Sequence, residues 1–222
     1  MRLSEFQQMI GKIYGRPDDQ MFSLYDLLSN QERFTMRALK GIRKGSAEKL
    51  KTNLLISFSW LMSVANRLHI NTEEVVWSRF PYKCSYCGLL PCACREIKQD
   101  FRSDTTSESG RSAPNSIGEY QRMFAAVYPP QKRDLVVAGI HLAEEMGEMS
   151  EAVHNFAGEH KQQQFENIRD ELADYISCIF GVANSANIDL ESELKEFFKD
   201  NCHVCHKAPC ECNFAYVATF NS

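Results

Sequence analysis

The sequence predicts an all-α protein that is written as a tandem of two similar helical halves, and three observations indicate this class. Apolar residues recur every three to four positions through the long segments of the chain, as on one face of a helix. No segment alternates apolar and polar residues in the way a half-buried strand does. One spacing of four cysteines occurs twice. The 44% hydrophobic share of the 222 residues is sufficient for a buried core.

The two cysteine motifs define the internal repeat. Both have the spacing C-x2-C-x4-C-x-C, and both carry a proline before the third cysteine. They lie 118 residues apart, and the same offset places Ala65 on Ala183. Near the N-terminus the offset is 114, which places Tyr14 on Tyr128. A repeat of this length with matched ends indicates duplication, with one short insertion expected in the loop around residues 158–164.

The repeat also predicts the domain boundaries. We expect a first helical domain over residues 1–97 and a second over residues 116–222. Residues 98–115 between them are polar, rich in serine and threonine, and interrupted by Gly110 and Pro114. Because this stretch has too few apolar residues to pack, it is expected to be a flexible linker.

The helices of each half follow from capping and breaking residues. Ser4 with Gln7, and Ser116 with Glu119, have the capping-box spacing that begins a helix. Gly158 is a candidate C-cap, and Asp189 is a candidate N-cap for a short last helix. The helices expected in the second half span about 116–127, 132–156, 162–183 and 189–199. Each half is therefore predicted to be a small helical unit closed by a cysteine motif.

Composition excludes several classes of protein. The formal net charge is −4, which disfavours a nucleic-acid binder. The first residues have no apolar core of the kind a signal peptide needs. The longest apolar run, residues 54–65, is far shorter than the roughly 20 residues that span a bilayer. We therefore expect a cytoplasmic protein with no membrane partner.

Paired carboxylates on two expected helices are the strongest chemical signal. Glu145 and Glu148 are three residues apart, as are Glu171 and Asp174, and residues at this spacing share a helix face. Two such helices packed side by side would bring four carboxylates together. Hard oxygen ligands of this kind suit Mg²⁺ or Mn²⁺, and a cation of this kind would hold the phosphates of a nucleotide.

An acidic helix is often no more than a solvated face, and helical phase tests that alternative. At about 100° per residue, Glu144 and Glu151 fall nearly opposite the apolar stripe. Glu145 and Glu148 instead flank the stripe, and Glu171 flanks the stripe of the next helix. A carboxylate at such a seam is costly unless it is compensated, and a metal ion would supply the compensation.

These residues also carry a family resemblance. The pattern Glu144-Glu145-x-x-Glu148, followed by Glu171-x-x-Asp174, resembles the motif of the all-α, MazG-like nucleotide pyrophosphohydrolases. That superfamily includes dimeric dUTPases and phosphoribosyl-ATP pyrophosphohydrolases. The resemblance extends over residues 117–201 and implies that the fold is a helical bundle.

The resemblance implies a reaction and a role for each residue. A nucleoside triphosphate would be hydrolysed at its α-phosphorus to a nucleoside monophosphate and pyrophosphate, by a water that the metal and a carboxylate activate. Glu144 would orient the water or act as its base. Lys195 and Lys199 would neutralise phosphate oxygens, although ordinary surface charge at a helix end remains open for both. The implied ligands of Mg²⁺ or Mn²⁺ are Glu145, Glu148, Glu171 and Asp174.

The first half lacks this chemistry. The repeat places Asn30 on Glu144, and it places Gln31, Phe34, Asn53 and Ile56 on the four implied ligands. Residues 1–97 are therefore expected to be a degenerate copy without a metal site. Because members of the family work as dimers or tetramers, the resemblance implies a pseudo-dimer with one active centre, which could itself form a homo-oligomer.

The cysteine motifs predict metal sites of a different kind. Four thiolates within eleven residues, in a chain without a secretion signal, favour tetrahedral Zn²⁺ over disulfides. All four positions are filled by protein, so the sites are expected to be structural, with an iron–sulfur cluster as the alternative. Cys178 lies outside the motifs and is expected to be a buried residue near the carboxylates. The expected zinc ligands are Cys84, Cys87, Cys92, Cys94, Cys202, Cys205, Cys210 and Cys212.

A second function class competes with the enzyme. The carboxylates could bind a metal–nucleotide complex as a sensor without cleaving it, while the cysteine knuckles dock a partner protein or nucleic acid. A purely structural role does not explain why the candidate ligands occur in one copy only.

Overall fold

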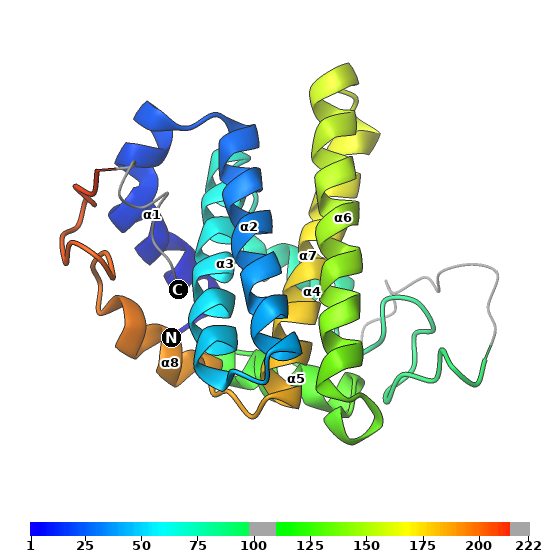
Figure 1. Ribbon diagram of the computed structural model, residues 1–222. Coiled ribbons are helices and arrows are strands. Elements are labelled where there is room, and N and C mark those ends of the chain that lie inside the picture. Colours follow the sequence, from blue (N-terminus) through cyan, green and yellow to red (C-terminus); the bar gives the residue numbers. More distant parts are fainter. Residues whose placement is uncertain (98–109, 214–222) are drawn as a thin grey trace. The chain divides into compact units, whose positions relative to one another are not determined.

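The computed structural model describes residues 1–97 and 110–213, and in these ranges the chain forms eight α-helices, one short 3₁₀ helix and no strand. The all-α prediction is confirmed (Figure 1). Most of the predicted linker, residues 98–109, lies outside the described part of the chain. None of the described helices is both long and apolar enough to cross a bilayer.

The chain divides into two compact units that differ from the sequential halves. The first unit comprises Met1–Asn71 together with the described part of Leu190–Ser222, and the second comprises Thr72–Asp189. Each unit therefore contains three helices of one half and the last helix and cysteine motif of the other half. The predicted domains, residues 1–97 and 116–222, follow the sequence repeat instead, and this division of the chain remains a prediction.

The first unit is built on a long helical hairpin. α2(Leu24–Arg43) and α3(Ala47–Arg67) pack along their lengths, with α1(Leu3–Met21) and α8(Leu190–Phe198) against α3. The hairpin is tight at Gly41, where a Cβ would lie 2.6 Å from the Leu50 nitrogen. Glycine is required there because any side chain would collide with the α3 backbone.

Two cap predictions need correction. α1 begins at Leu3 after an Arg2 cap, so Ser4 lies inside the helix rather than at its cap. In the second unit, α6(Leu135–Glu159) ends past Gly158, and His160 closes it in the left-handed conformation with φ of 54°. Because helices of this kind fray by a residue or two, cap positions are less well determined by sequence than the helices themselves.

The second unit, like the first, contains four α-helices in its described residues. α6 packs along α7(Gln162–Ser185), while α4(Thr72–Arg79) and α5(Ile117–Val127) also pack on α7. A short 3₁₀ helix, Pro130–Lys132, joins α5 to α6. The side chain of Ser116 accepts from the Glu119 backbone and caps α5 as predicted.

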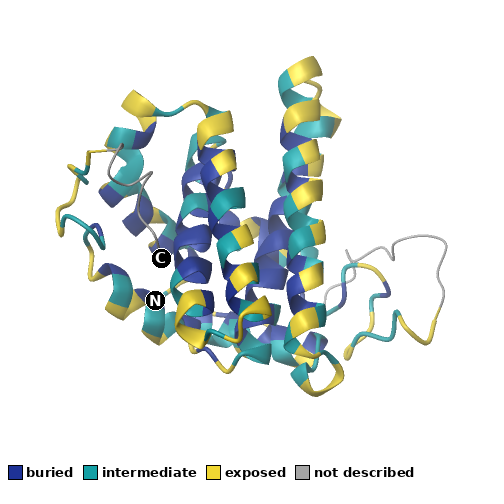
Figure 2. Ribbon diagram, in the orientation of Figure 1, coloured by how far each residue is buried: buried dark blue, intermediate teal, exposed yellow. Residues whose placement is uncertain are grey.

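Aromatic side chains fill the core of each unit. In the first unit, Phe6 contacts Phe58 with ring centroids 5.1 Å apart. In the second, Phe124 lies 5.2 Å from both Phe80 and Phe180. These rings are almost wholly inaccessible, so they supply much of the apolar burial that stabilises each unit. Exposed residues recur along one side of α6, as the amphipathic pattern requires (Figure 2).

The two units also share one hydrogen-bond pattern. In the first, Gln7 donates to the Ile70 carbonyl at 2.7 Å, and Asn66 donates back to the Gln7 carbonyl at 3.2 Å. In the second, Gln121 donates to the Ile188 carbonyl at 2.7 Å, and Asn184 donates to the Gln121 carbonyl at 3.1 Å. The same pair of amides thus ties the first helix of each half to the end of its third helix.

Candidate functional site

Three carboxylates meet at the seam between α6 and α7. Glu145 and Glu148 project from α6, and Glu171 projects from α7. One oxygen of each lies within 4.8 Å of the others, a spacing at which they could share a metal ion. The spacing of three residues on α6 places its two glutamates on one face, and the packing of α7 adds the third.

Two oxygens in this cluster are buried without a hydrogen-bond partner in the described part of the chain. They are Oε2 of Glu145 and Oε2 of Glu171. A buried carboxylate oxygen without a partner is costly, because it has lost water and gained nothing in return. The cluster offers hard oxygens of the type that Mg²⁺ and Mn²⁺ prefer, so the donor set fits a divalent cation.

Burial and the neighbouring negative charges both raise the pKa values of Glu145 and Glu171. Burial raises the pKa of Glu145 to about 8, and the negative charges of Asp174, Glu148 and Glu171 add to the effect. Burial likewise raises the pKa of Glu171 to about 7, together with the charges of Asp174 and Glu148. A bound cation would reverse this preference and hold the carboxylates in their charged form.

Asp174 lies outside the group of three glutamates. It is 6% exposed, and the guanidinium of Arg79 donates to both of its oxygens, Nη2 to Oδ2 at 2.7 Å and Nε to Oδ1 at 3.2 Å. Nη1 of Arg79 donates to Asp170 at 3.0 Å. Asp174 is still close enough to raise the pKa values of Glu145 and Glu171, so it belongs to the same charged neighbourhood.

Sequence reasoning missed Arg79. It is the last residue of α4, a helix that belongs to the first half of the repeat but packs on α7 of the second. Arg79 lies 95 residues before Asp174, and no local pattern links the two. A basic residue at a helix end is usually surface charge, so only the packing of α4 on α7 could have identified it.

The neighbouring residues fall largely where helical phase places them. Glu144 and Glu151 are exposed. Cys178 is buried, and burial raises the pKa of its thiol, so it is a neutral residue beside Glu145 rather than a thiolate. His141 is partly buried one turn before Glu145, and burial lowers its pKa.

The two lysines expected to bind substrate lie in the other compact unit. Lys195 is on α8 and pairs with Glu191 at 2.7 Å. Lys199 follows α8 and pairs with Glu196 at 2.6 Å. Each ammonium thus has a carboxylate partner close by in the same stretch of chain.

The positions in the first unit that correspond to the carboxylates are buried, and their amide nitrogens donate hydrogen bonds, whereas Oε1 of Gln31 has no partner in the described part of the chain. Gln31 donates to the Thr35 hydroxyl at 3.1 Å, and Asn53 donates to the Lys49 carbonyl at 2.7 Å. Phe34 and Ile56 are each 2% exposed. No metal-binding carboxylate group occurs among the described residues of this unit.

The cysteine motifs form two clusters of four sulfurs. The sulfurs of each cluster lie within 4.8 Å of one another, and none of the nine cysteines, all of which are described, forms a disulfide. Backbone N–H groups point at the sulfurs, for example from Tyr86 to Cys84 and from Val204 to Cys202, both at 3.4 Å. This donor set fits a tetrahedral metal ion, because the N–H groups stabilise the thiolates that a metal needs.

Each cluster is held by the first helix of the opposite half. The Cys92 nitrogen donates to the Val127 carbonyl at 2.8 Å, and the Cys210 nitrogen donates to the Ile13 carbonyl at 2.7 Å. The hydroxyl of Tyr128 donates to the Cys84 sulfur at 3.5 Å. The equivalent Tyr14 hydroxyl hydrogen-bonds the Cys202 sulfur and also lies 3.1 Å from Nδ1 of His203.

The carboxylates and their helices lie in the part of the chain that resembles a known family. Residues 138–207 match the family model of the MazG nucleotide pyrophosphohydrolase domain. The match includes the three clustered glutamates and Asp174, and it ends within the second cysteine motif. Comparison with curated proteins returned no match, and comparison with solved structures returned none. The MazG match therefore indicates a nucleotide pyrophosphohydrolase, a class of hydrolases that usually uses divalent metal ions.

Proposed function

We propose that this protein is a Mg²⁺-dependent nucleoside triphosphate pyrophosphohydrolase, which converts a (d)NTP and water to a (d)NMP and pyrophosphate. The observation that carries the proposal is the group of three glutamates with two orphaned buried oxygens, inside the segment that matches the MazG model. A divalent cation bound there, Mg²⁺ or Mn²⁺, would withdraw charge from the phosphate oxygens and make a bound water easier to deprotonate.

The protein's own residues have distinct tasks in this reaction. Glu145, Glu148 and Glu171 would hold the cation; Glu145 and Glu171 are partly buried at the α6–α7 seam, whereas Glu148 is exposed beside them. Glu144 is the exposed carboxylate next to this group, and it accepts the proton of the attacking water. Attack by that water at the α-phosphorus breaks the bond to the β-phosphate oxygen, which leaves as pyrophosphate.

Asp174 has two roles open to it in the proposal. In the described arrangement it fixes Arg79, and a reorientation of its side chain would add it to the metal ligands. The second arrangement would free the Arg79 guanidinium to pair with phosphate oxygens, which it suits by its planar fork of donors. Lys195 and Lys199 neutralise phosphate charge only if they leave Glu191 and Glu196.

The cysteine clusters are assigned as structural zinc sites. Four protein sulfurs fill a tetrahedral shell and leave no position for substrate. Elemental analysis of the purified protein tests the assignment, with two zinc ions expected per chain. The visible absorption of an iron–sulfur cluster would overturn it.

The duplication and the pseudo-dimer form part of the same proposal. The matching amide pairs and the matching contacts from Cys92 and Cys210 support them. The first half then acts as a partner that has lost its own metal ligands and supplies Arg79 to the active unit. Light scattering tests whether this pseudo-dimer assembles further into a homo-oligomer.

The activity is tested with a panel of nucleoside triphosphates and Mg²⁺, with monophosphate and pyrophosphate as the measured products. Glu148→Gln should abolish turnover because it removes a charged metal ligand. The matched control is Glu151→Gln, which removes an exposed carboxylate less than one turn away and should leave turnover unchanged. The proposal fails if no nucleotide is cleaved, or if both variants lose activity equally.

One observation favours a second candidate, binding without cleavage. With Arg79 held on Asp174, the metal group has three carboxylates rather than four, which suits a sensor of a metal–nucleotide complex. Calorimetry distinguishes the two candidates. Tight Mg²⁺-dependent binding with intact nucleotide recovered afterwards would establish the sensor and exclude the hydrolase.

A further inference from the structure

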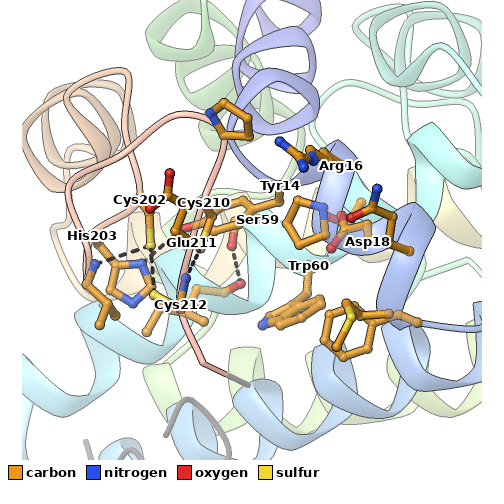
Figure 3. Close-up of a pocket in the computed structure, with 18 of the residues that line it drawn as sticks. Tyr14, Arg16, Asp18, Ser59, Trp60, Cys202, His203, Cys210, Glu211 and Cys212 are labelled. Carbon is orange, nitrogen blue, oxygen red and sulfur yellow. Dashed lines mark hydrogen bonds between the residues drawn. The ribbon is translucent and has the colours of Figure 1, made fainter. Parts of the chain in front are cut away.

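The first unit contains a cavity of about 450 Å³ that the proposed reaction does not use. Its lining comes from α1, α2, α3 and the second cysteine motif, all within the same compact unit. Figure 3 shows Cys202 and Cys212 at one side of this space, Arg16 and Asp18 at the other, and Trp60 between them. Sulfurs of the second cysteine cluster form one end, so the space available to a further ligand is the aromatic end.

The sequence repeat relates the residues that line this cavity to those of the carboxylate site. Phe34 and Ile56 line it, and they stand at the positions of Glu148 and Asp174 in the other copy. Trp60 also lines it and stands at the position of Cys178, which lies beside Glu145. The cavity is thus the counterpart of the carboxylate site, with the charges replaced by apolar and aromatic surface. Neither Phe34 nor Ile56 can bind a hard cation, and the apolar surface that they share with Trp60 favours a flat group.

The aromatic end is shaped for such a group. Trp60 and Phe22 meet edge to face, with ring centroids 5.6 Å apart and planes at 89°. Trp60 remains partly exposed in this arrangement. The accessible part of the Trp60 ring borders the cavity, where a planar ring could stack on it.

Polar groups at the same end could form hydrogen bonds with the edge of that ring. Asp18 is 6% exposed and lines the cavity, and the Ser63 hydroxyl donates to its carboxylate. A carboxylate has about four acceptor positions, so one donor leaves capacity for others. The Gln20 amide lies in the same lining and offers both a donor and an acceptor. Ring N–H and amino groups of a nucleobase match such acceptors and amides.

We propose that the first unit binds a nucleobase in this cavity, as part of a nucleoside or nucleotide and without a metal ion. The volume falls within the roughly 300–1,000 Å³ typical of small-ligand sites. Stacking supplies affinity, and Asp18 with Gln20 supplies selectivity among bases. The degenerate copy has then exchanged a metal-dependent phosphate site for a metal-independent base site.

Intrinsic fluorescence tests this site directly, because the chain has two tryptophans and only Trp60 lines the cavity. Full-length Trp77→Phe leaves Trp60 as the single reporter. Nucleosides and nucleoside monophosphates of each base are titrated in a buffer without Mg²⁺. Saturable quenching is expected for at least one base. Equal affinity of nucleoside and monophosphate would show that the base alone is held, and a tighter monophosphate would show a further contact from Arg16.

Calorimetry on variants locates the ligand. Trp60→Ala should weaken binding by about 5- to 150-fold, the loss expected for one stacked base, and Trp60→Phe should restore most of it. Trp77→Ala is the matched control and should leave affinity unchanged, as should Glu148→Gln in the carboxylate site. Thermal melting verifies that each variant is folded.

Three results would overturn the proposal. They are the absence of saturable quenching up to the solubility limit of every base, an affinity that Trp60→Ala leaves unchanged, and binding that Glu148→Gln abolishes. The last would place the ligand at the carboxylates. A failure of the hydrolase assay would not affect this test, because the buffer holds no Mg²⁺ and the measured event is binding.

Discussion

Nη2 of Arg79 lies 2.7 Å from Oδ2 of Asp174, and Nε of the same guanidinium lies 3.2 Å from Oδ1. This two-point ion pair joins α4 to α7 inside the second unit. The arginine follows the first helices of the chain and precedes the first cysteine motif, and the aspartate lies in the segment that matches the MazG model. A helix outside the matched segment therefore contributes a side chain to the candidate site.

Removal of Arg79 should destabilise the protein strongly when no metal is present. The side chains of Arg79 and Asp174 are 12% and 8% exposed, so Arg79→Ala leaves a buried charge without compensation. The expected loss is about 3–5 kcal/mol of unfolding free energy, measured by urea denaturation. Arg169→Ala is the control, because its partner Glu74 is 64% exposed and such pairs contribute at most about 1 kcal/mol. Equal losses for the two variants would contradict this prediction.

Divalent metal ions should stabilise the protein through the three glutamates. Binding to the folded state alone adds about 2.7 kcal/mol at a concentration 100 times the dissociation constant. We expect the Tm to rise saturably with Mg²⁺ or Mn²⁺ for the natural sequence. Glu171→Gln should remove the rise, while Glu151→Gln should keep it. An identical rise for Glu171→Gln would mean that the ion binds elsewhere.

Asp18 should make the stability fall as pH rises. Burial raises its pKa to about 6, opposed by the Ser63 hydroxyl and the Arg67 charge. The folded state therefore holds this proton more tightly than the unfolded state does, and the stability that the proton provides is lost between about pH 4 and pH 6. Above that range Asp18→Asn should be more stable than the natural sequence, by about 1–3 kcal/mol.

The comparison is made by urea denaturation at pH 4 and pH 7.5. The stability difference between Asp18→Asn and the natural sequence should be small at the lower pH and large at the higher one. Asp19→Asn provides the control, because the neighbouring Asp19 side chain is 77% exposed and should show no such change. A pH-independent difference for Asp18→Asn would refute the assignment.

The cysteine clusters should behave as two independent metal sites. Cys205→Ser removes one of the four sulfurs of the second cluster, so one of two metal equivalents should be lost and the Tm should fall. Cys178→Ala should keep both equivalents, because this buried thiol lies outside the clusters. Metal content is measured by elemental analysis after gel filtration. Loss of both equivalents in Cys205→Ser would show that the clusters depend on each other.

Local patterns in the sequence predict the helices well, and they also group side chains that the structure places close together. The spacing of Glu145 and Glu148 is a property of one helix, and the four cysteines of each motif lie within one short loop. Helical phase also separates exposed Glu151 from the partly buried Glu145. Such features depend only on neighbours a few residues away, and a helical repeat of about 3.6 residues places them without knowledge of the rest of the fold.

The sequence by itself determined an all-α chain, the repeat of its cysteine motifs and the carboxylates that belong together. Tertiary packing alone decided that α4 and α8 join helices of the opposite half, that Arg79 holds Asp174, and that Phe34, Ile56 and Trp60 border a cavity. The physical reason is the separation along the chain between the residues that make each contact. Hydrogen bonds within a helix are set by adjacent turns, whereas a contact between residues almost a hundred positions apart depends on which apolar faces pack together, and that choice is made by the whole core.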